Sequence, residues 1–154
     1  MKLSRKIGLG LVLILVILQF IRPSKNVSEQ LITTDDISNT YAVPKDVHQI
    51  FIKKCYDCHS NNTTYLWYYN IQPVGLWMGH HIDEGKDELN FSAFKTYTAK
   101  RANHKLEEIS ESVTDGWMPI DSYLWMHHEA KVTPAETSAI NTWIKSLGVK
   151  VEKN

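Results

Sequence analysis

Two cysteines and a histidine within one pentapeptide constrain this chain more than any other feature. The stretch KKCYDCHS, residues 53–60, holds Cys55 and Cys58, which are the only cysteines among the 154 residues. His59 follows the second cysteine directly. A chain that keeps both of its thiols at one place, beside an imidazole, uses them for a specific chemistry rather than for general packing.

Three chemistries use two cysteines at this spacing, and the flanking sequence separates them. A thioredoxin-like redox pair requires a βαβ unit, whereas the flanks here have helical periodicity. A structural zinc site requires further ligands at defined spacing, and the adjacent histidine pairs 80–81 and 127–128 are not a standard second pair. Covalent haem attachment uses two thiols and the next imidazole. Because only this chemistry uses all three residues, the sequence predicts thioethers at Cys55 and Cys58 and iron ligation by His59.

The sequence predicts an all-α fold. Pro44 suits the first turn of a helix that leads into the cysteines. Further on, AKRANHKLEEISESVTDG has apolar residues at helical spacing and ends in Gly116, a helix stop. The stretch VTPAETSAINTWIKSLG begins with Thr133 as an N-cap and Pro134 in the first helical position. A short helix is expected from Pro73, and neither an alternating strand pattern nor an internal repeat is apparent.

The first 23 residues form a separate apolar segment. Lys2, Arg5 and Lys6 precede an apolar run of 15 residues from Ile7 to Ile21. A cleaved signal peptide and an uncleaved signal-anchor both remain open. The run is shorter than the roughly 17–25 residues of a typical spanning helix. Because no small-residue cleavage site follows it, we favour a single-pass anchor in the inner membrane. Both interpretations predict export, with the domain in the periplasm.

The rest of the chain divides into a tether and one domain. Residues 24–43 are polar and aperiodic, which predicts a tether, and residues 44–150 carry the helical patterns. Outside residues 1–23 the chain holds 13 basic and 17 acidic side chains, a net charge of −4. A negatively charged domain without a basic patch disfavours nucleic acid as a partner.

A methionine between the two C-terminal helices is a candidate for the second iron ligand. Met118 lies in the stretch DGWMP, where Pro119 prevents helix and lets the side chain project from an extended segment. A thioether on a constrained loop is a good axial ligand for haem iron. The alternatives are an open site or another side chain, chiefly His80, His81, Met78 or Met126.

The order of these features resembles a small class I c-type cytochrome. More narrowly, SNNTTYLWYYNIQPVGLWMGHH together with LEEISESVTDGWMPIDSYLWMHHEAKVT resembles the haem-binding domain family of exported bacterial proteins. The resemblance covers residues 44–148 and implies a cytochrome c-like helical domain around one covalent haem c. It implies that Cys55, Cys58 and His59 form the haem site. By the same resemblance, Met118 is the distal ligand.

These features favour one-electron transfer as the function. An iron with both axial positions filled by histidine and methionine is suited to electron transfer. The sequence shows no Ser/His/Asp pattern, no Gly-rich phosphate loop and no paired carboxylates with a clear role, so the chain is not expected to be an enzyme. A redox partner protein is expected. The alternative is a haem-based sensor or a peroxidase-like domain with a displaceable distal ligand, to which His80 or His81 supplies a polar group.

Overall fold

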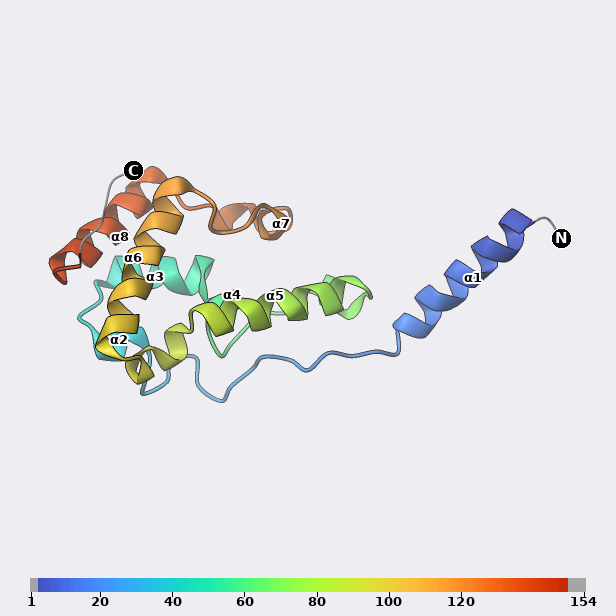
Figure 1. Cartoon of the computed structure of the whole chain (residues 1–154), viewed down its shortest axis with the longest axis horizontal. Helices are drawn as coiled ribbons and strands as arrows, with labels where there is room; N and C mark the ends of the chain where they lie inside the picture. Colours follow the sequence, from blue (N-terminus) through green and yellow to red (C-terminus); the bar gives the residue numbers. More distant parts are fainter. Residues whose placement is uncertain (1–2, 150–154) are drawn as a thin grey trace.

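The computed structural model describes residues 3–149, and the regular secondary structure in this range is helical (Figure 1). No strand occurs within this range, and the predicted all-α class is confirmed. Lys2 and the predicted domain end at residue 150 lie outside the described residues. The elements follow in this order: α1 Leu3–Leu18, α2 Ile37–Thr40, α3 Lys45–Lys54, α4 Tyr56–His59, 3-10 helix η1 Trp67–Asn70, α5 Val74–Glu88, 3-10 helix η2 Phe91–Thr96, α6 Ala99–Asp115, α7 Asp121–Leu124, 3-10 helix η3 His128–Ala130 and α8 Pro134–Ser146.

The hydrophobic core lies where α8 packs against both α6 and α3. Phe51 of α3 stacks on Phe91 with 5.0 Å between ring centroids and meets Trp143 of α8 edge-on at 5.7 Å. Burying a side chain of this size contributes about 1.5–3 kcal/mol. The aliphatic part of the core comes from the predicted helical faces: Val47, Ile50, Leu106, Ile109, Val113, Ile140 and Ile144.

Local sequence signals set the ends of α6 and α8. Gly116 ends α6 with φ +74°, a left-handed conformation that favours glycine. Thr133 caps α8, and its hydroxyl and the Glu136 carboxylate form a reciprocal capping box. Both predicted helices are therefore confirmed. They are joined by a long connection, residues 116–133.

Helix α5 begins after Pro73, as predicted, but runs for 15 residues rather than as a short helix. The Gln72 side chain accepts a hydrogen bond from the Leu76 N–H at 2.9 Å and so stabilises the first turn. Ile82 is buried, and α5 packs along α4. Tertiary packing therefore extends a helix whose glycines and adjacent histidines give it little intrinsic propensity.

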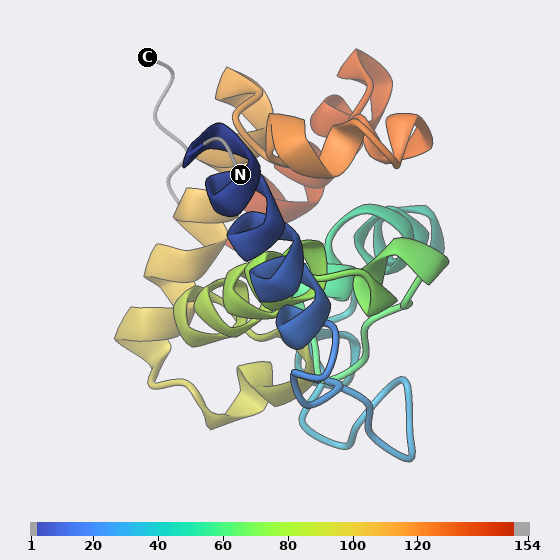
Figure 2. The ribbon, with the colours of Figure 1, turned by 90° about the vertical axis from the view of Figure 1, so that its right-hand side faces the viewer.

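The apolar N-terminal run folds as α1, which contains no buried residue. The helix lies apart from the other helices in Figure 1 and in front of them in Figure 2. Its 16 residues extend about 24 Å, less than the roughly 30 Å hydrocarbon core of a bilayer. Within residues 3–149 no helix combines the length and the apolar character needed to cross a membrane. The structure therefore does not support the predicted membrane helix. After α1, the Gln19 amide and the Gln72 backbone exchange two hydrogen bonds of 3.0 Å.

Residues 24–43, predicted as a tether, lie against the domain. The Asn26 side chain donates to the Ser60 carbonyl oxygen at 2.8 Å. Further along, Asp36 and Ile37 are both 0% exposed, and the Asp36 carboxylate caps α2. This segment thus supplies buried side chains to the domain, which its polar composition conceals.

Candidate functional site

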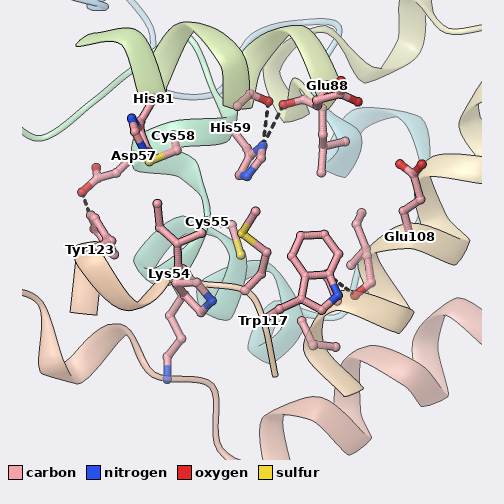
Figure 3. Close-up of a pocket in the computed structure, with 18 of the residues that line it drawn as sticks. Lys54, Cys55, Asp57, Cys58, His59, His81, Glu88, Glu108, Trp117 and Tyr123 are labelled. Carbon is pink, nitrogen blue, oxygen red and sulfur yellow. Dashed lines mark hydrogen bonds between the residues drawn. The ribbon is translucent and has the colours of Figure 1, made fainter. Parts of the chain in front are cut away.

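A cavity of about 520 Å³ opens between α4 and α5 on one side and the loop after α6 on the other (Figure 3). Its volume falls in the range of small-molecule and cofactor sites, about 300–1,000 Å³. All four residues that the sequence predicts as haem contacts line it: Cys55, Cys58, His59 and Met118. Much of the remaining wall is apolar and comes from several elements: Leu89, Phe91, Ile109, Val113, Ile120 and Val132.

The two cysteines are free thiols that lie where α3 ends and α4 follows. Burial raises the pKa of Cys55 to about 12, with a smaller contribution from the neighbouring Cys58. Burial likewise raises the pKa of Cys58 to about 12, and Asp57 adds to the effect. Both side chains are therefore protonated at neutral pH, which disfavours the thiolate chemistry of disulfide exchange.

His59 is held in one orientation by the C-terminal end of α5. Its Nδ1 lies 2.8 Å from the Gly85 carbonyl oxygen and 3.1 Å from that of Leu89. Since both partners are acceptors, Nδ1 carries the proton, and Nε2 keeps its lone pair for another ligand. Burial lowers the pKa of His59, although the two carbonyls oppose this effect. The imidazole is thus neutral and directed into the cavity, the state that a metal-ligating histidine requires (Figure 3).

Gly85 permits this arrangement because it brings α5 into direct contact with α4. A Cβ atom added at Gly85 would lie 2.8 Å from the Cys58 carbonyl oxygen and 3.3 Å from its Cβ. Any side chain at this position would therefore push the Cys-Tyr-Asp-Cys-His segment away from α5. The sequence gives no signal for this contact, because an isolated glycine in a helix does not indicate what packs against it.

Hydrogen bonds also fix both residues between the two cysteines. The Tyr56 hydroxyl donates to the buried Asp36 carboxylate at 2.9 Å from Oδ2. Asp57 in turn accepts a hydrogen bond from the Tyr123 hydroxyl at 2.8 Å (Figure 3). The second Asp57 oxygen accepts from the Thr64 N–H at 2.9 Å. The segment that carries the thiols, Cys55 and α4, is consequently held by hydrogen bonds on two sides.

The loop after α6 forms the wall opposite His59. The chain leaves α6 at Gly116, and Trp117 lies across the cavity from His59 (Figure 3). Met118 is half-buried and lines the same cavity. Its backbone N–H donates to the Ser112 carbonyl oxygen at 3.4 Å. The loop that places Trp117 across from His59 thus also brings a thioether to the cavity wall.

Among the alternative histidine ligands, His81 lines the cavity and His80 does not. His81 belongs to α5, whose C-terminal end accepts the hydrogen bond from His59. It lies on the same side of the cavity as His59 (Figure 3). His80 is 67% exposed and reaches Glu84 at 3.2 Å. Neither histidine is therefore opposite His59.

The other alternative ligands lie away from the cavity. Neither Met78 nor Met126 belongs to its lining, and Met126 is 52% exposed. His127 is buried but turns its Nε2 to the Tyr68 hydroxyl at 2.6 Å. Of the three methionines within residues 3–149, only Met118 lines the cavity.

Acidic side chains line the edge of the cavity toward α6. Lys105 Nζ lies 2.6 Å from Glu108 Oε2 and 3.2 Å from Glu88 Oε2. Burial alone would lower the pKa of Lys105, but the hydrogen bonds to these two carboxylates outweigh it and raise the pKa. Lys105 therefore stays charged and offsets part of the acidic charge at this edge.

The side chains present fit a haem group. The cavity has the size and the apolar wall of a cofactor site, and a neutral imidazole and two protonated thiols face it. Within residues 3–149 no group of three or more His, Cys, Asp or Glu side chains is arranged to hold a metal ion directly. The zinc alternative therefore has no site in the part of the chain that the structure describes.

Fold and site together define a small, all-helical, haem-binding protein. A family model described as a haem-binding domain matches residues 13–146, most of the chain, and the protein belongs to this family. The match begins within α1 and includes residues 24–43, in agreement with the packing of that segment on the domain. A comparison with curated proteins found no match, and neither did a comparison with solved structures.

Proposed function

We propose that the protein is a c-type cytochrome that transfers single electrons. In this proposal Cys55 and Cys58 hold the haem through thioethers, His59 is the proximal ligand and Met118 is the distal ligand. One observation carries the proposal: these four side chains line one cavity, and Trp117, the residue before Met118, lies across it from His59.

Each residue has a separate task in this proposal. The haem supplies an iron that changes its charge by one electron. The carbonyls of Gly85 and Leu89 fix the ring of His59, so that Nε2 keeps one direction in both redox states. The Met118 thioether would be the second ligand of the iron and would favour its reduced state. The apolar wall excludes water and keeps reorganisation small.

The competing function, a sensor or peroxidase-like domain, requires a distal position that a small molecule can occupy and a polar group beside it. His81 is the polar candidate that reaches the cavity. Its place on the same side as His59 does not suit this role, because the group would have to act on the opposite side. The geometry therefore favours electron transfer.

We also propose that the domain is exported and works in the periplasm. Covalent attachment of haem to two cysteines occurs on the exported side in bacteria, and the basic residues Lys2, Arg5 and Lys6 before an apolar run are typical of an export signal. Fractionation with a periplasmic and a cytoplasmic marker tests this. Recovery of haem-loaded protein with the cytoplasmic marker would contradict it.

Covalent attachment is tested by denaturing the purified protein and extracting it with acidified acetone. Haem is expected to stay with the polypeptide. Cys55→Ser and Cys58→Ser should each leave at most one thioether, and the double variant should release all haem. Complete extraction of haem from the unaltered protein would show that the bond is not covalent.

A further inference from the structure

Helix α7 lies directly after residues 116–120, the loop that carries Met118 and is called here the Met118 loop. The helix contributes no side chain to the core. None of its residues, Asp121–Leu124, is buried. A short helix with no buried side chain has little hydrophobic burial to fix its position. Specific side-chain interactions must therefore decide where α7 and the loop before it lie.

Tyr123 provides these interactions. Its hydroxyl donates to Asp57 Oδ2 at 2.8 Å, and its ring stacks on that of His127 with 4.2 Å between centroids and 7° between planes. His127 is itself fixed by the Tyr68 hydroxyl at 2.6 Å. Tyr123 therefore joins the loop of residues 116–133 to the segment that holds the cysteines.

Asp57 is a rigid acceptor for this hydrogen bond. Its other oxygen accepts from the Thr64 N–H at 2.9 Å, and its backbone carbonyl accepts from the Thr63 hydroxyl at 2.6 Å. Since Asp57 lies between Cys55 and Cys58, its position is tied to the attachment motif. The Asp57–Tyr123 bond consequently links two parts of the chain that are 66 residues apart.

The link reaches Met118 through a short, hydrogen-bonded turn. The Tyr123 N–H donates to the Ile120 carbonyl oxygen at 3.0 Å, and Ile120 is separated from Met118 by Pro119 alone. Proline restricts the backbone between them. A displacement of Tyr123 is therefore transmitted to Met118 rather than absorbed by a flexible connection.

We propose that Tyr123 is a positioning residue, whose hydrogen bond to Asp57 holds the Met118 loop closed over the cavity and keeps the thioether opposite His59. This inference rests on the proposed function, because it assumes that Met118 is the distal ligand. Without the hydroxyl, the loop opens more often and the sixth position of the iron becomes accessible to small molecules.

The test compares carbon monoxide uptake by the reduced, haem-loaded protein for several variants. Tyr123→Phe keeps the ring and its stacking on His127 and removes only the hydroxyl. A hydrogen bond to a charged acceptor is strong enough that its loss should increase the open population, and with it the rate of carbon monoxide uptake, by roughly 10-fold. The optical band of the methionine–iron bond in the oxidised protein should weaken, and the covalent haem content should not change.

Tyr69→Phe is the matched control, since the Tyr69 hydroxyl donates to the Ser24 carbonyl oxygen at 3.2 Å, away from the Met118 loop. This variant should behave as the unaltered protein. Asp57→Asn tests the bond from its other side, because Thr64 and Tyr123 donate to different oxygens of Asp57 and one of these becomes an NH₂ group that cannot accept. Asp57→Asn should also increase the rate of carbon monoxide uptake. If Tyr123→Phe does not accumulate, the rate of Asp57→Asn alone tests the role of the hydrogen bond.

Met118→Ala separates this inference from the proposed function. If Met118→Ala binds carbon monoxide fast while Tyr123→Phe and Asp57→Asn match the unaltered protein, the positioning role of Tyr123 is wrong and Met118 remains the ligand. If Met118→Ala itself takes up carbon monoxide no faster than the unaltered protein, the assignment of Met118 is wrong, and the role of Tyr123 fails with it.

Discussion

The Nδ1 atom of His59 lies 2.8 Å from the carbonyl oxygen of Gly85, and the same glycine lets the backbone of Cys58 approach α5. One residue of α5 therefore contacts both His59 and the cysteine segment before it. It supplies the acceptor that orients the imidazole, and its missing side chain gives room for the cysteine segment.

Replacing this glycine should separate the two elements. In Gly85→Ala the new Cβ meets the Cys58 carbonyl oxygen at 2.8 Å, a backbone atom that cannot rotate away. We expect a loss of about 1–3 kcal/mol in the free energy of unfolding and a lower haem content. Denaturant titration and the haem absorbance per chain measure both.

Gly79→Ala is the control for that variant, because it lies in the same helix and its Cβ would meet nothing closer than the Pro23 side chain at 3.6 Å. Alanine there should leave the stability unchanged or raise it by up to about 1 kcal/mol through helix propensity. Equal stability of the two variants would mean that the contact with Cys58 does not constrain the fold.

The proposed ligation of iron by Met118 leads to a second prediction. Met118→Ala should lower the midpoint potential, on the order of 100 mV, because the thioether favours reduced iron. Met126→Ala removes the same side chain from a position that is 52% exposed and outside the cavity, so its potential should stay that of the unaltered protein. Redox titrations that give the same potential for both variants would contradict the assignment.

The ion pair between α3 and α8 gives a pH-dependent prediction. Glu136 Oε2 lies 2.7 Å from Lys54 Nζ. Burial would raise the pKa of Glu136, but the hydrogen bonds from Lys54 and Thr133 outweigh it and lower the pKa below its usual range. The resulting stabilisation is complete above the unfolded pKa of about 4.3 and is lost as the pH falls through the lower folded pKa.

Glu136→Gln should therefore reduce the free energy of unfolding by about 0.5–1 kcal/mol at pH 7 and by much less near pH 3. Glutamine can still complete the capping box, so the difference reports the charge. Glu111→Gln, at an exposed position on α6, is the control and should change little at either pH. A loss that is the same at both pH values would exclude the ion pair as its cause.

Truncation should distinguish a tether from a part of the domain. Removal of residues 1–22 keeps Asp36 and Ile37, whereas removal of residues 1–40 takes away both fully buried side chains and leaves the Tyr56 hydroxyl without its acceptor. We expect the longer truncation to cost about 3 kcal/mol or more and the shorter one to leave the domain folded. Both chains would be produced behind the same exchangeable export signal and compared by thermal unfolding. Equal melting temperatures of the two truncated chains would mean that residues 24–43 are a tether and not part of the folded domain.

The sequence predicted the helices whose ends carry their own local signals. Gly116 ends α6 and Thr133 caps α8 through contacts within a few residues, so both could be read without the fold. The four candidate haem residues could be named because their chemistry is specific, and the structure brings them to one cavity. Whether Met118 binds the iron stays a prediction.

Other features depend on contacts that have no local signature. The acceptor for His59 is a backbone carbonyl 26 residues away, and any residue type provides one. The packing of residues 24–43 depends on Asp36, a residue type that is usually exposed at the surface. Asp36 can be buried because Ser38 and Tyr56 donate hydrogen bonds to its carboxylate. Composition alone cannot reveal a buried charge of this kind.

The two middle residues of the motif Cys-Tyr-Asp-Cys-His have a consequence for the sequence variation that the site tolerates. The spacing of the cysteines requires nothing of these positions, which a pattern search leaves free. In this chain Tyr56 reaches Asp36 and Asp57 reaches Tyr123, so each is one half of a pair whose other half lies far along the sequence. A variant that exchanges Tyr56 or Asp57 alone would still match the Cys-x-x-Cys-His pattern. The segment between its cysteines, however, would lose one of the two hydrogen bonds that fix it. Substitution at these positions is therefore expected to be coupled to Asp36 and Tyr123, and a graft of the pentapeptide into another helical protein would have to bring both partners with it.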